Sequence, residues 1–206
     1  MKNKELRFIT EIGIFTALGL VLDYAAGWYS NFIFPSGGSI SIAMVPIFII
    51  AFRWGLKGGL TVGFLIGAIQ VVYSEVFGWG LSSLVLVAVI FFDYVFAYTV
   101  CGLAGVFAKK AKGLDNMPGK LNFVTYGILL ATSIRSIFHI TSGWLFFRAW
   151  IPEFFLENSD YVWWYWSIIY NLGYMVPSAI LCILIMHAIF SRFHKRLLDV
   201  DSFMFG

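Results

Sequence analysis

Long apolar runs separated by short polar stretches dominate the chain. Six segments predict helices of mainly apolar residues: 8–28, 40–52, 58–77, 81–107, 122–147 and 161–190. A helix needs about 20 such residues to cross the hydrocarbon core of a bilayer, and most of these segments reach that length. Segment 40–52 is shorter and contains Pro46, so we expect it to be tilted, broken or covered by its neighbours. The pattern predicts an all-α integral membrane protein, residues 1–206, with six transmembrane helices in a single domain.

The composition excludes a soluble protein. Of the 206 residues, 60% are hydrophobic and only 12% are charged, about half the charged share of an ordinary globular domain. The two cysteines, Cys101 and Cys182, both lie inside apolar segments. They therefore support neither a disulfide framework nor a metal site built on cysteine.

The distribution of basic residues predicts the orientation. Of the 14 lysines and arginines, all but Arg135 and Arg148 fall on one side of the six-segment arrangement, together with both termini. Loops rich in Lys and Arg stay in the cytoplasm, so we expect cytoplasmic N- and C-termini and a location in the bacterial cell membrane. A five-segment arrangement would scatter the same charges over both sides.

The connections on the opposite side are rich in aromatic residues and contain Glu153, Glu157 and Asp160. Part of this is the aromatic belt usual at a membrane interface. The remainder fits equally well a site for a cationic or aromatic ligand, or long solvated loops.

Small residues recur at intervals of four in three segments: Gly13 and Ala17; Gly59, Gly63 and Gly67; Ala97, Cys101 and Gly105. Such stripes let a neighbouring helix backbone approach closely. For the second and third stripes we expect packing within the molecule. For Gly13 and Ala17 the pattern leaves open internal packing or docking of another membrane protein.

Four polar residues lie at membrane depth: Asp93, Arg135, His139 and Asn171. An Asp or Arg at a helix centre costs about 2.5–3.5 kcal/mol, so such residues face a partner or a cavity. One interpretation is an internal Asp93–Arg135 ion pair, with the other two as hydrogen bonds between helices. The alternative is a cavity open to the non-cytoplasmic side, in which Asp93 attracts a cation and His139 and Asn171 orient it.

Motifs for chemistry are missing from the sequence. It contains no phosphate-binding G-x-x-x-x-G-K-[ST] loop, no H-E-x-x-H pair, no G-x-S-x-G elbow and no cluster of metal ligands. We therefore expect no enzyme and no bound cofactor or metal, and energy for active transport would have to come from a partner or an ion gradient. An intramembrane enzyme using Asp93, Arg135 and His139 is the weaker alternative, and a passive assembly subunit is another.

Several stretches closely resemble the thiamine transporter ThiT family. They are residues 37–47 (GGSISIAMVPI), 52–60 (FRWGLKGGL), 92–94 (FDY), 139–143 (HITSG) and 170–178 (YNLGYMVPS). The resemblance runs through nearly the whole chain in the same order. It implies a six-helix S component of an energy-coupling factor (ECF) transporter, which captures thiamine outside the cell. A transmembrane coupling protein and two cytoplasmic ATPases would supply the energy.

The resemblance also carries substrate-binding positions onto this chain: Asp93, Tyr94, Arg135, His139, Gly143, Phe147, Trp166 and Asn171. It implies that Asn171 reads the aminopyrimidine of thiamine. Because a guanidinium beside a cationic ligand needs a negative partner, we predict that Arg135 pairs with Asp93 and orients its carboxylate, or helps to accept a phosphorylated vitamin. The family's docking motif, two alanines four apart on the first helix, reads Gly13 and Ala17 here.

The aromatic positions depart from the family's pattern. Phe147 stands where some members have tryptophan, although Trp144 could serve instead, and Trp166 replaces a residue that is often tyrosine. A loop tryptophan of some members falls at Gly37, so Trp28 or a loop phenylalanine would take its part. An S component for another aromatic vitamin, riboflavin or a pyridoxine-like compound, is the alternative.

Overall fold

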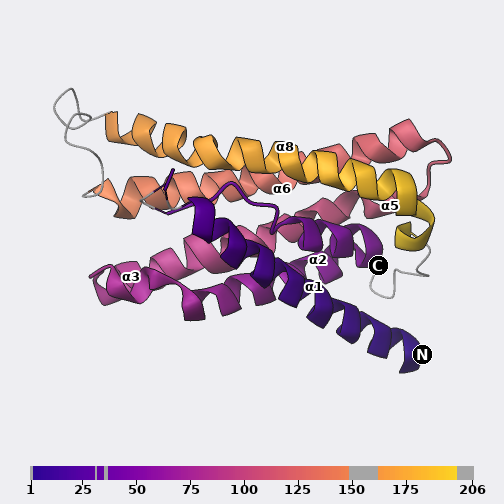
Figure 1. Ribbon diagram of the computed structural model, residues 1–206, viewed down its shortest axis with the longest axis horizontal. Helices are drawn as coiled ribbons and strands as arrows, with labels where there is room; N and C mark the ends of the chain where they lie inside the picture. Colours follow the sequence, from indigo (N-terminus) through magenta and orange to yellow (C-terminus); the bar gives the residue numbers. More distant parts are fainter. Residues whose placement is uncertain (1, 31, 35–36, 149–161, 199–206) are drawn as a thin grey trace.

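The computed structural model describes residues 2–30, 32–34, 37–148 and 162–198. Within these ranges the chain is helical and contains no β-strand. The elements are α1 Lys2–Ser30, α2 Val45–Tyr73, η1 Glu75–Gly78, α3 Ser83–Val89, η2 Ile90–Phe96, α4 Ala97–Thr99, η3 Val100–Phe107, α5 Ala108–Lys112, α6 Met117–Phe146 and α8 Val162–Leu198. The long helices run roughly along the longest axis of the molecule, and α1 crosses them at an angle (Figure 1).

Five stretches of the described chain are long and apolar enough to cross a membrane: Asn3–Ser30, Val45–Tyr73, Ser83–Lys112, Met117–Phe146 and Trp163–Leu198. The expected all-helical membrane protein is confirmed. The expected number of six spans is not confirmed, because most of the second and third predicted segments belong to one element, α2.

α2 nevertheless consists of two arms, because the chain folds back at Gly55. This glycine has φ 74° and ψ −167°, a non-helical conformation in which only glycine is comfortable. A methyl group added to Gly59 would lie 2.7 Å from Cβ of Ala51, although residues eight apart in a straight helix are separated by about 12 Å. The first arm, from Val45 to Trp54, is roughly 15 Å long, about half the hydrocarbon core.

The short arm is buried along its whole length, as expected for a segment covered by its neighbours. Pro46 lies in its first turn, where the missing N–H breaks no helical hydrogen bond. The six-span count stays a prediction.

The helix from Ser83 to Lys112 changes its winding along its length. A π-helical turn, η2, is followed by the short α4 and by the tighter 3₁₀ segment η3. Its backbone lies directly against the long arm of α2: a methyl group on Gly63 would come within 2.3 Å of the Tyr98 carbonyl oxygen, and one on Gly102 within 2.2 Å of the Leu60 nitrogen. The prediction that these small residues pack within the molecule is confirmed.

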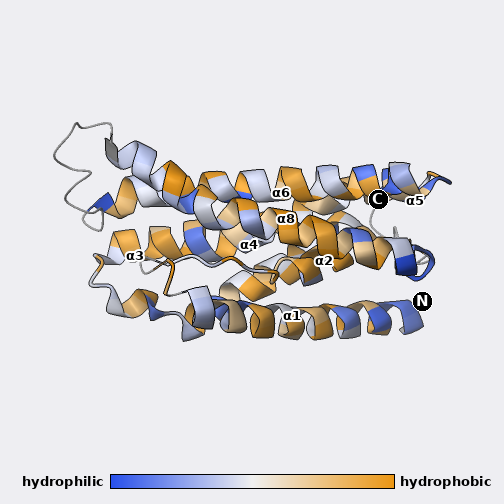
Figure 2. Cartoon of the chain, turned by 45° about the horizontal axis from the view of Figure 1, so that its top comes forward, coloured by the Kyte–Doolittle hydropathy of each residue, from blue (hydrophilic) through white to orange (hydrophobic). Residues whose placement is uncertain are grey.

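The start of α1, the short α5 and the last turns of α8 gather at one end of the bundle (Figures 1 and 2). At that end Glu11 accepts hydrogen bonds from Arg53 Nε at 2.5 Å, Trp54 Nε1 at 2.6 Å and Arg7 Nε at 2.9 Å. Arg53 also donates to the backbone carbonyl of Arg196. This network fastens α1 to the turn of α2 and to α8.

The middle of α1 presents an open face. Gly13 and Ala17 are exposed, and a methyl group on Gly13 would meet nothing within 4 Å. Ile14 and Leu18 beside them are also exposed. Packing within the molecule, one of the two interpretations of this stripe, is therefore wrong for the described chain.

Candidate functional site

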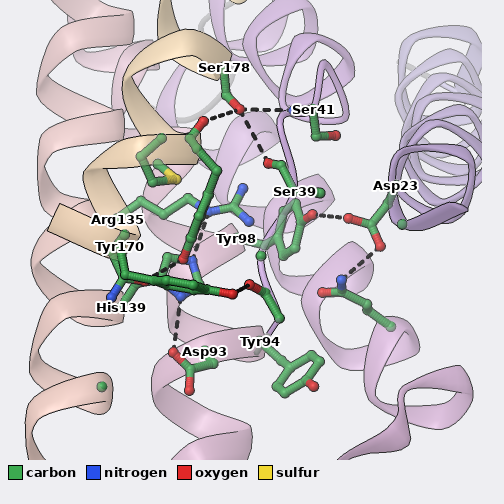
Figure 3. Close-up of a pocket in the computed structure, with 18 of the residues that line it drawn as sticks. Asp23, Ser39, Ser41, Asp93, Tyr94, Tyr98, Arg135, His139, Tyr170 and Ser178 are labelled. Atoms are coloured by element: carbon green, nitrogen blue, oxygen red, sulfur yellow. Dashed lines mark hydrogen bonds and ion pairs between the residues drawn. The ribbon is translucent and has the colours of Figure 1, made fainter. Parts of the chain in front are cut away.

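A cavity of about 250 Å³ opens between α1, α2, η2, α6, α8 and the segment that precedes α2 (Figure 3). All eight residues expected to bind substrate line it: Asp93, Tyr94, Arg135, His139, Gly143, Phe147, Trp166 and Asn171. They come from three helices that are far apart in the sequence. The cavity interpretation of the polar residues at membrane depth therefore describes their arrangement better than a set of separate helix contacts.

Asp93 is held in place by two donors from α6. It lies in the π-helical turn η2, a kind of distortion that is frequent at functional sites. One carboxylate oxygen is 3.0 Å from His139 Nδ1, and the other accepts a hydrogen bond from Ser142 Oγ at 2.5 Å. The carboxylate thus has a fixed position at the cavity wall before any ligand arrives.

The protonation of His139 follows from its two neighbours. Arg135 Nε donates to His139 Nε2 over 3.2 Å, and a guanidinium can only donate. Nε2 is therefore unprotonated, and the ring is a neutral imidazole that carries its proton on Nδ1 and donates it to Asp93. The imidazole adds no charge to the cavity.

Arg135 makes no ion pair with Asp93; the pair expected from the sequence is wrong. His139 stands between them, since α6 places it one turn after Arg135 and within hydrogen-bond reach of both. The guanidinium instead lies over the ring of Tyr98, 3.9 Å from its centroid, and its Nη1 is 4.0 Å from Cys101 Sγ. Any orienting effect of Arg135 on the carboxylate passes through the imidazole.

Asn171 lies on α8 with its amide already engaged by protein groups. Tyr174 donates its hydroxyl to the Asn171 side-chain oxygen at 2.5 Å, and the amide nitrogen donates to the Ser167 carbonyl at 2.8 Å. Gly143 of α6 makes room for this arrangement, because a methyl group there would come within 2.4 Å of Ser167 Oγ. The space beside Gly143 is thus taken by α8.

Aromatic rings make up much of the remaining wall. Phe147 lines the cavity and packs edge-on against Trp79, with ring centroids 5.6 Å apart. Trp166 also lines it, and its ring centroid lies 5.5 Å from that of Tyr170. Trp144, the alternative to Phe147, stacks on Trp163 and does not line the cavity.

Of the candidates to replace the loop tryptophan, Trp28 is 78% exposed. Phe34 instead contacts the rings of Tyr170 and Tyr174, with centroids 5.8 and 5.5 Å apart. The loop phenylalanine, rather than Trp28, therefore lies beside the aromatic wall.

The segment before α2 is fastened across the cavity to α8. Gly37 and Gly38, both with positive φ, line the cavity, and the Gly37 carbonyl accepts a hydrogen bond from Tyr170 at 2.9 Å. Further along, the backbone N–H of Ser41 donates to Ser178 Oγ at 2.8 Å. A methyl group on Gly38 would lie 2.4 Å from the Tyr174 ring, so only glycine fits there.

Asp23 on α1 and Gln70 on α2 are among the polar residues of the cavity wall that the sequence did not predict. Asp23 is only 7% exposed and accepts hydrogen bonds from Gln70 Nε2 at 2.7 Å, from Tyr73 at 3.0 Å and from Tyr98. The available signal was a lone aspartate within an apolar segment, which is costly at membrane depth.

The cavity carries a net negative charge. Among the described residues that line it, Asp23, Asp93 and Arg135 belong to the charged types, so two carboxylates and one guanidinium give a formal charge of −1, with His139 counted as neutral. Such a site favours a monocation. Glu153, Glu157 and Asp160, the acidic residues expected in the aromatic connection, lie outside the described residues.

Comparisons with known proteins match this chain along nearly its whole length. A family described as thiamine transporter protein matches residues 9–198. The thiamine transporter ThiT of Bacillus subtilis (strain 168) is 35% identical over 204 residues, 98% of each chain. Thiamine transporter ThiT of Lacticaseibacillus paracasei is 25% identical over 189 residues, which are 90% of this chain and 87% of that protein.

A solved structure supports the fold independently. The structure of ThiT from Listeria monocytogenes superposes with a TM-score of 0.72 over 95% of this chain and 98% of that chain, at 20% sequence identity. At this identity the likeness concerns the arrangement of the helices.

Proposed function

The chain belongs to the thiamine transporter family, and from this premise we propose that it binds thiamine as the substrate-capturing component of an uptake transporter. The observation that carries the proposal is the fixed Asp93 carboxylate in an aromatic cavity of net charge −1. Thiamine is a monocation because its thiazolium ring has a permanent positive charge. One bound molecule would therefore neutralise the cavity.

The two rings of thiamine suit the two kinds of group in the wall. The thiazolium ring lies beside Asp93, where charge attraction and neighbouring aromatic faces both stabilise a cation. The aminopyrimidine lies toward Asn171, whose amide keeps further hydrogen-bonding capacity beyond its present partners. Tyr94, Phe147 and Trp166 supply apolar and aromatic surface around the ligand.

The size of the cavity favours thiamine over riboflavin. Its volume of about 250 Å³ is at the small end of ligand pockets, which span roughly 300–1,000 Å³. Two small linked rings suit this space better than three fused rings with a ribityl chain. Pyridoxine is small enough, but it has no permanent positive charge to attract the Asp93 carboxylate.

Energy for uptake would come from other subunits. The sequence has no phosphate-binding loop for ATP. We propose that the chain is an S component, a single six-span domain in the bacterial cell membrane with both termini in the cytoplasm. It captures thiamine on the extracellular side and works with an ECF coupling protein and two cytoplasmic ATPases. The exposed small face around Gly13 and Ala17 would receive the coupling protein.

Titration of the purified protein tests the binding proposal. Trp79 and Trp166 line the cavity, so thiamine at micromolar concentration or below should quench tryptophan fluorescence in a saturable way. Calorimetry should detect no binding of riboflavin or pyridoxine at the same concentrations. Asp93→Asn should weaken thiamine binding about 100-fold, the cost of about 2.7 kcal/mol expected when a partly buried charge pair is lost. Saturable binding of a rival vitamin without thiamine binding would reject the proposal.

A further inference from the structure

Asp23 is a buried carboxylate whose hydrogen-bond partners are all neutral. It lies on α1 at the side of the cavity opposite His139 (Figure 3). Gln70, Tyr73 and Tyr98 donate to it. Neutral donors satisfy its lone pairs but leave its charge uncompensated, and a buried carboxylate without a positive partner is strongly unfavourable. A cation must therefore balance it.

Arg135 is the cation within reach, and Tyr98 lies between the two. The guanidinium carbon is 3.9 Å from the centroid of the Tyr98 ring, and the hydroxyl of the same ring donates to Asp23. Figure 3 shows the three residues in a row across the cavity wall.

Asp93, in contrast, has no cation of its own. Its two contacts are the neutral imidazole of His139 and the hydroxyl of Ser142. The direct hydrogen-bond partners of Arg135 are likewise neutral, namely His139 and Cys101. The charge of the Arg135 guanidinium is thus offset mainly by Asp23, and the negative charge of Asp93 has no protein cation to offset it.

We propose that Asp23 is a specificity-determining residue of the cavity: it offsets the charge of Arg135, so that Asp93 remains available for a monocationic heteroaromatic ligand. The inference rests on the proposed thiamine site. Without Asp23, the charges of Asp93 and Arg135 cancel to zero. The cavity then loses its preference for a cation while it keeps its shape and its aromatic wall.

The test compares thiamine with a neutral analogue in which a thiophene replaces the thiazolium ring. Calorimetry on the full-length protein gives the ratio of the two affinities. Asp23→Asn should lower this cation preference on the order of tenfold, because the substitution removes one unit of negative charge from a cavity of low effective dielectric constant. Asp23→Glu should preserve the preference.

A second substitution separates charge balance from a merely structural role. Asp23→Asn combined with Arg135→Gln returns the cavity to −1, so the double variant should recover the wild-type preference. Arg135→Gln alone should raise it by a similar factor, and this holds as a test even where Asp23→Asn does not fold. Glu11→Gln is the matched control, because it removes a hydrogen-bonded carboxylate of α1 far from the cavity wall; it should leave the preference unchanged.

Failure of this inference can be distinguished from failure of the proposed function. Wild-type protein that does not bind thiamine would reject the proposed function itself. Wild-type protein that prefers thiamine, with the same preference in Asp23→Asn or with no recovery in the double variant, would overturn only the role of Asp23.

Discussion

At the scale of single residues, the Asp93 carboxylate is positioned without help from a ligand. His139 and Ser142 hold both of its oxygens, and Arg135 fixes the proton of the imidazole on the nitrogen that faces Asp93. A group that is already oriented loses little conformational freedom on binding, so more of the charge attraction contributes to affinity. We therefore expect the groups behind Asp93 to affect binding although they do not touch the ligand.

Ser142→Ala tests this expectation. The substitution removes one of the two hydrogen bonds that hold the carboxylate and leaves its charge intact, so thiamine affinity should fall about 10- to 150-fold, for a hydrogen bond to a charged group worth about 1.5–3 kcal/mol. Calorimetric titration provides the measurement. Ser136→Ala is the matched control, because the Ser136 hydroxyl donates to the Thr132 carbonyl of its own helix and does not contact Asp93. Equal affinities of the two variants would contradict the positioning role.

The sequence predicts which residues line the cavity better than it predicts their contacts. The residues expected to bind substrate do line one cavity, because motifs carried over from a family preserve positions relative to the helices. The predicted Asp93–Arg135 ion pair is wrong. Helical spacing places Arg135 and His139 side by side on α6, but it does not show which of the two side chains reaches Asp93. Asp23 was missed because its partners come from segments far along the chain, which no local pattern reveals.

At the scale of helices, two features together position Asp93 and Tyr94. One is the π-helical turn η2, and the other is the glycine seam, the stripe of Gly59, Gly63 and Gly67 on α2 that packs against the next helix. Gly67 lies so close to η2 that a methyl group would come within 2.4 Å of the Tyr94 carbonyl oxygen. The small residues were predicted to pack internally from their spacing alone. The fold-back at Gly55 and the change of winding in the next helix depend on backbone dihedral angles, and apolar patterning does not report these.

Gly63→Ala should disturb this seam. A methyl group there would lie 2.3 Å from the Tyr98 carbonyl oxygen and 2.9 Å from the Thr99 Cα, and backbone atoms cannot move aside as a flexible side chain can. We expect a loss of stability of about 1–3 kcal/mol, typical of overpacking, seen as a lower Tm in detergent. Gly13→Ala, which meets nothing within 4 Å, should leave Tm nearly unchanged. A Tm for Gly63→Ala equal to that of the wild type would argue against the close backbone contact.

The exposed face of α1 around Gly13 and Ala17 leads to a separate prediction about assembly. Ala17→Leu places a large side chain on the small, exposed stripe and should weaken copurification with the coupling protein, while thiamine affinity stays the same. Ala188→Leu, at an exposed small residue of α8, is the matched control. An intact complex with Ala17→Leu would remove the docking role from this face.

At the scale of the whole molecule, the ends of the bundle differ in charge. Most of the basic residues predicted to share one side lie on α1, α5 and α8, whose ends gather together; the others are Arg53 and Lys57 on either side of the turn in α2, and Lys120 in the first turn of α6. η1 and α3 lie at the opposite end (Figure 1). The grouping of charges could be predicted from sequence because it depends on the order of the segments. The number of spans could not be predicted in the same way. The short arm of α2 is buried by its neighbours, so the length rule for a helix that crosses the bilayer alone does not apply to it.

Labelling in intact cells tests the proposed orientation. Cys101 and Cys182 are buried, so the wild-type protein should not react with a membrane-impermeant maleimide. Gly78→Cys, on η1 with open space around it, should be labelled from outside, whereas Asp115→Cys, between α5 and α6, should react only after the cells are opened. The reverse pattern would place the basic end outside and contradict the proposed topology.

The most direct test of the central claim is an experimental structure of the protein with thiamine bound. We predict density for one thiamine molecule in the cavity, with its thiazolium ring beside Asp93 and its aminopyrimidine within hydrogen-bonding distance of Asn171. A saturated complex whose thiamine lies elsewhere, or whose thiazolium ring is remote from Asp93, would contradict the account.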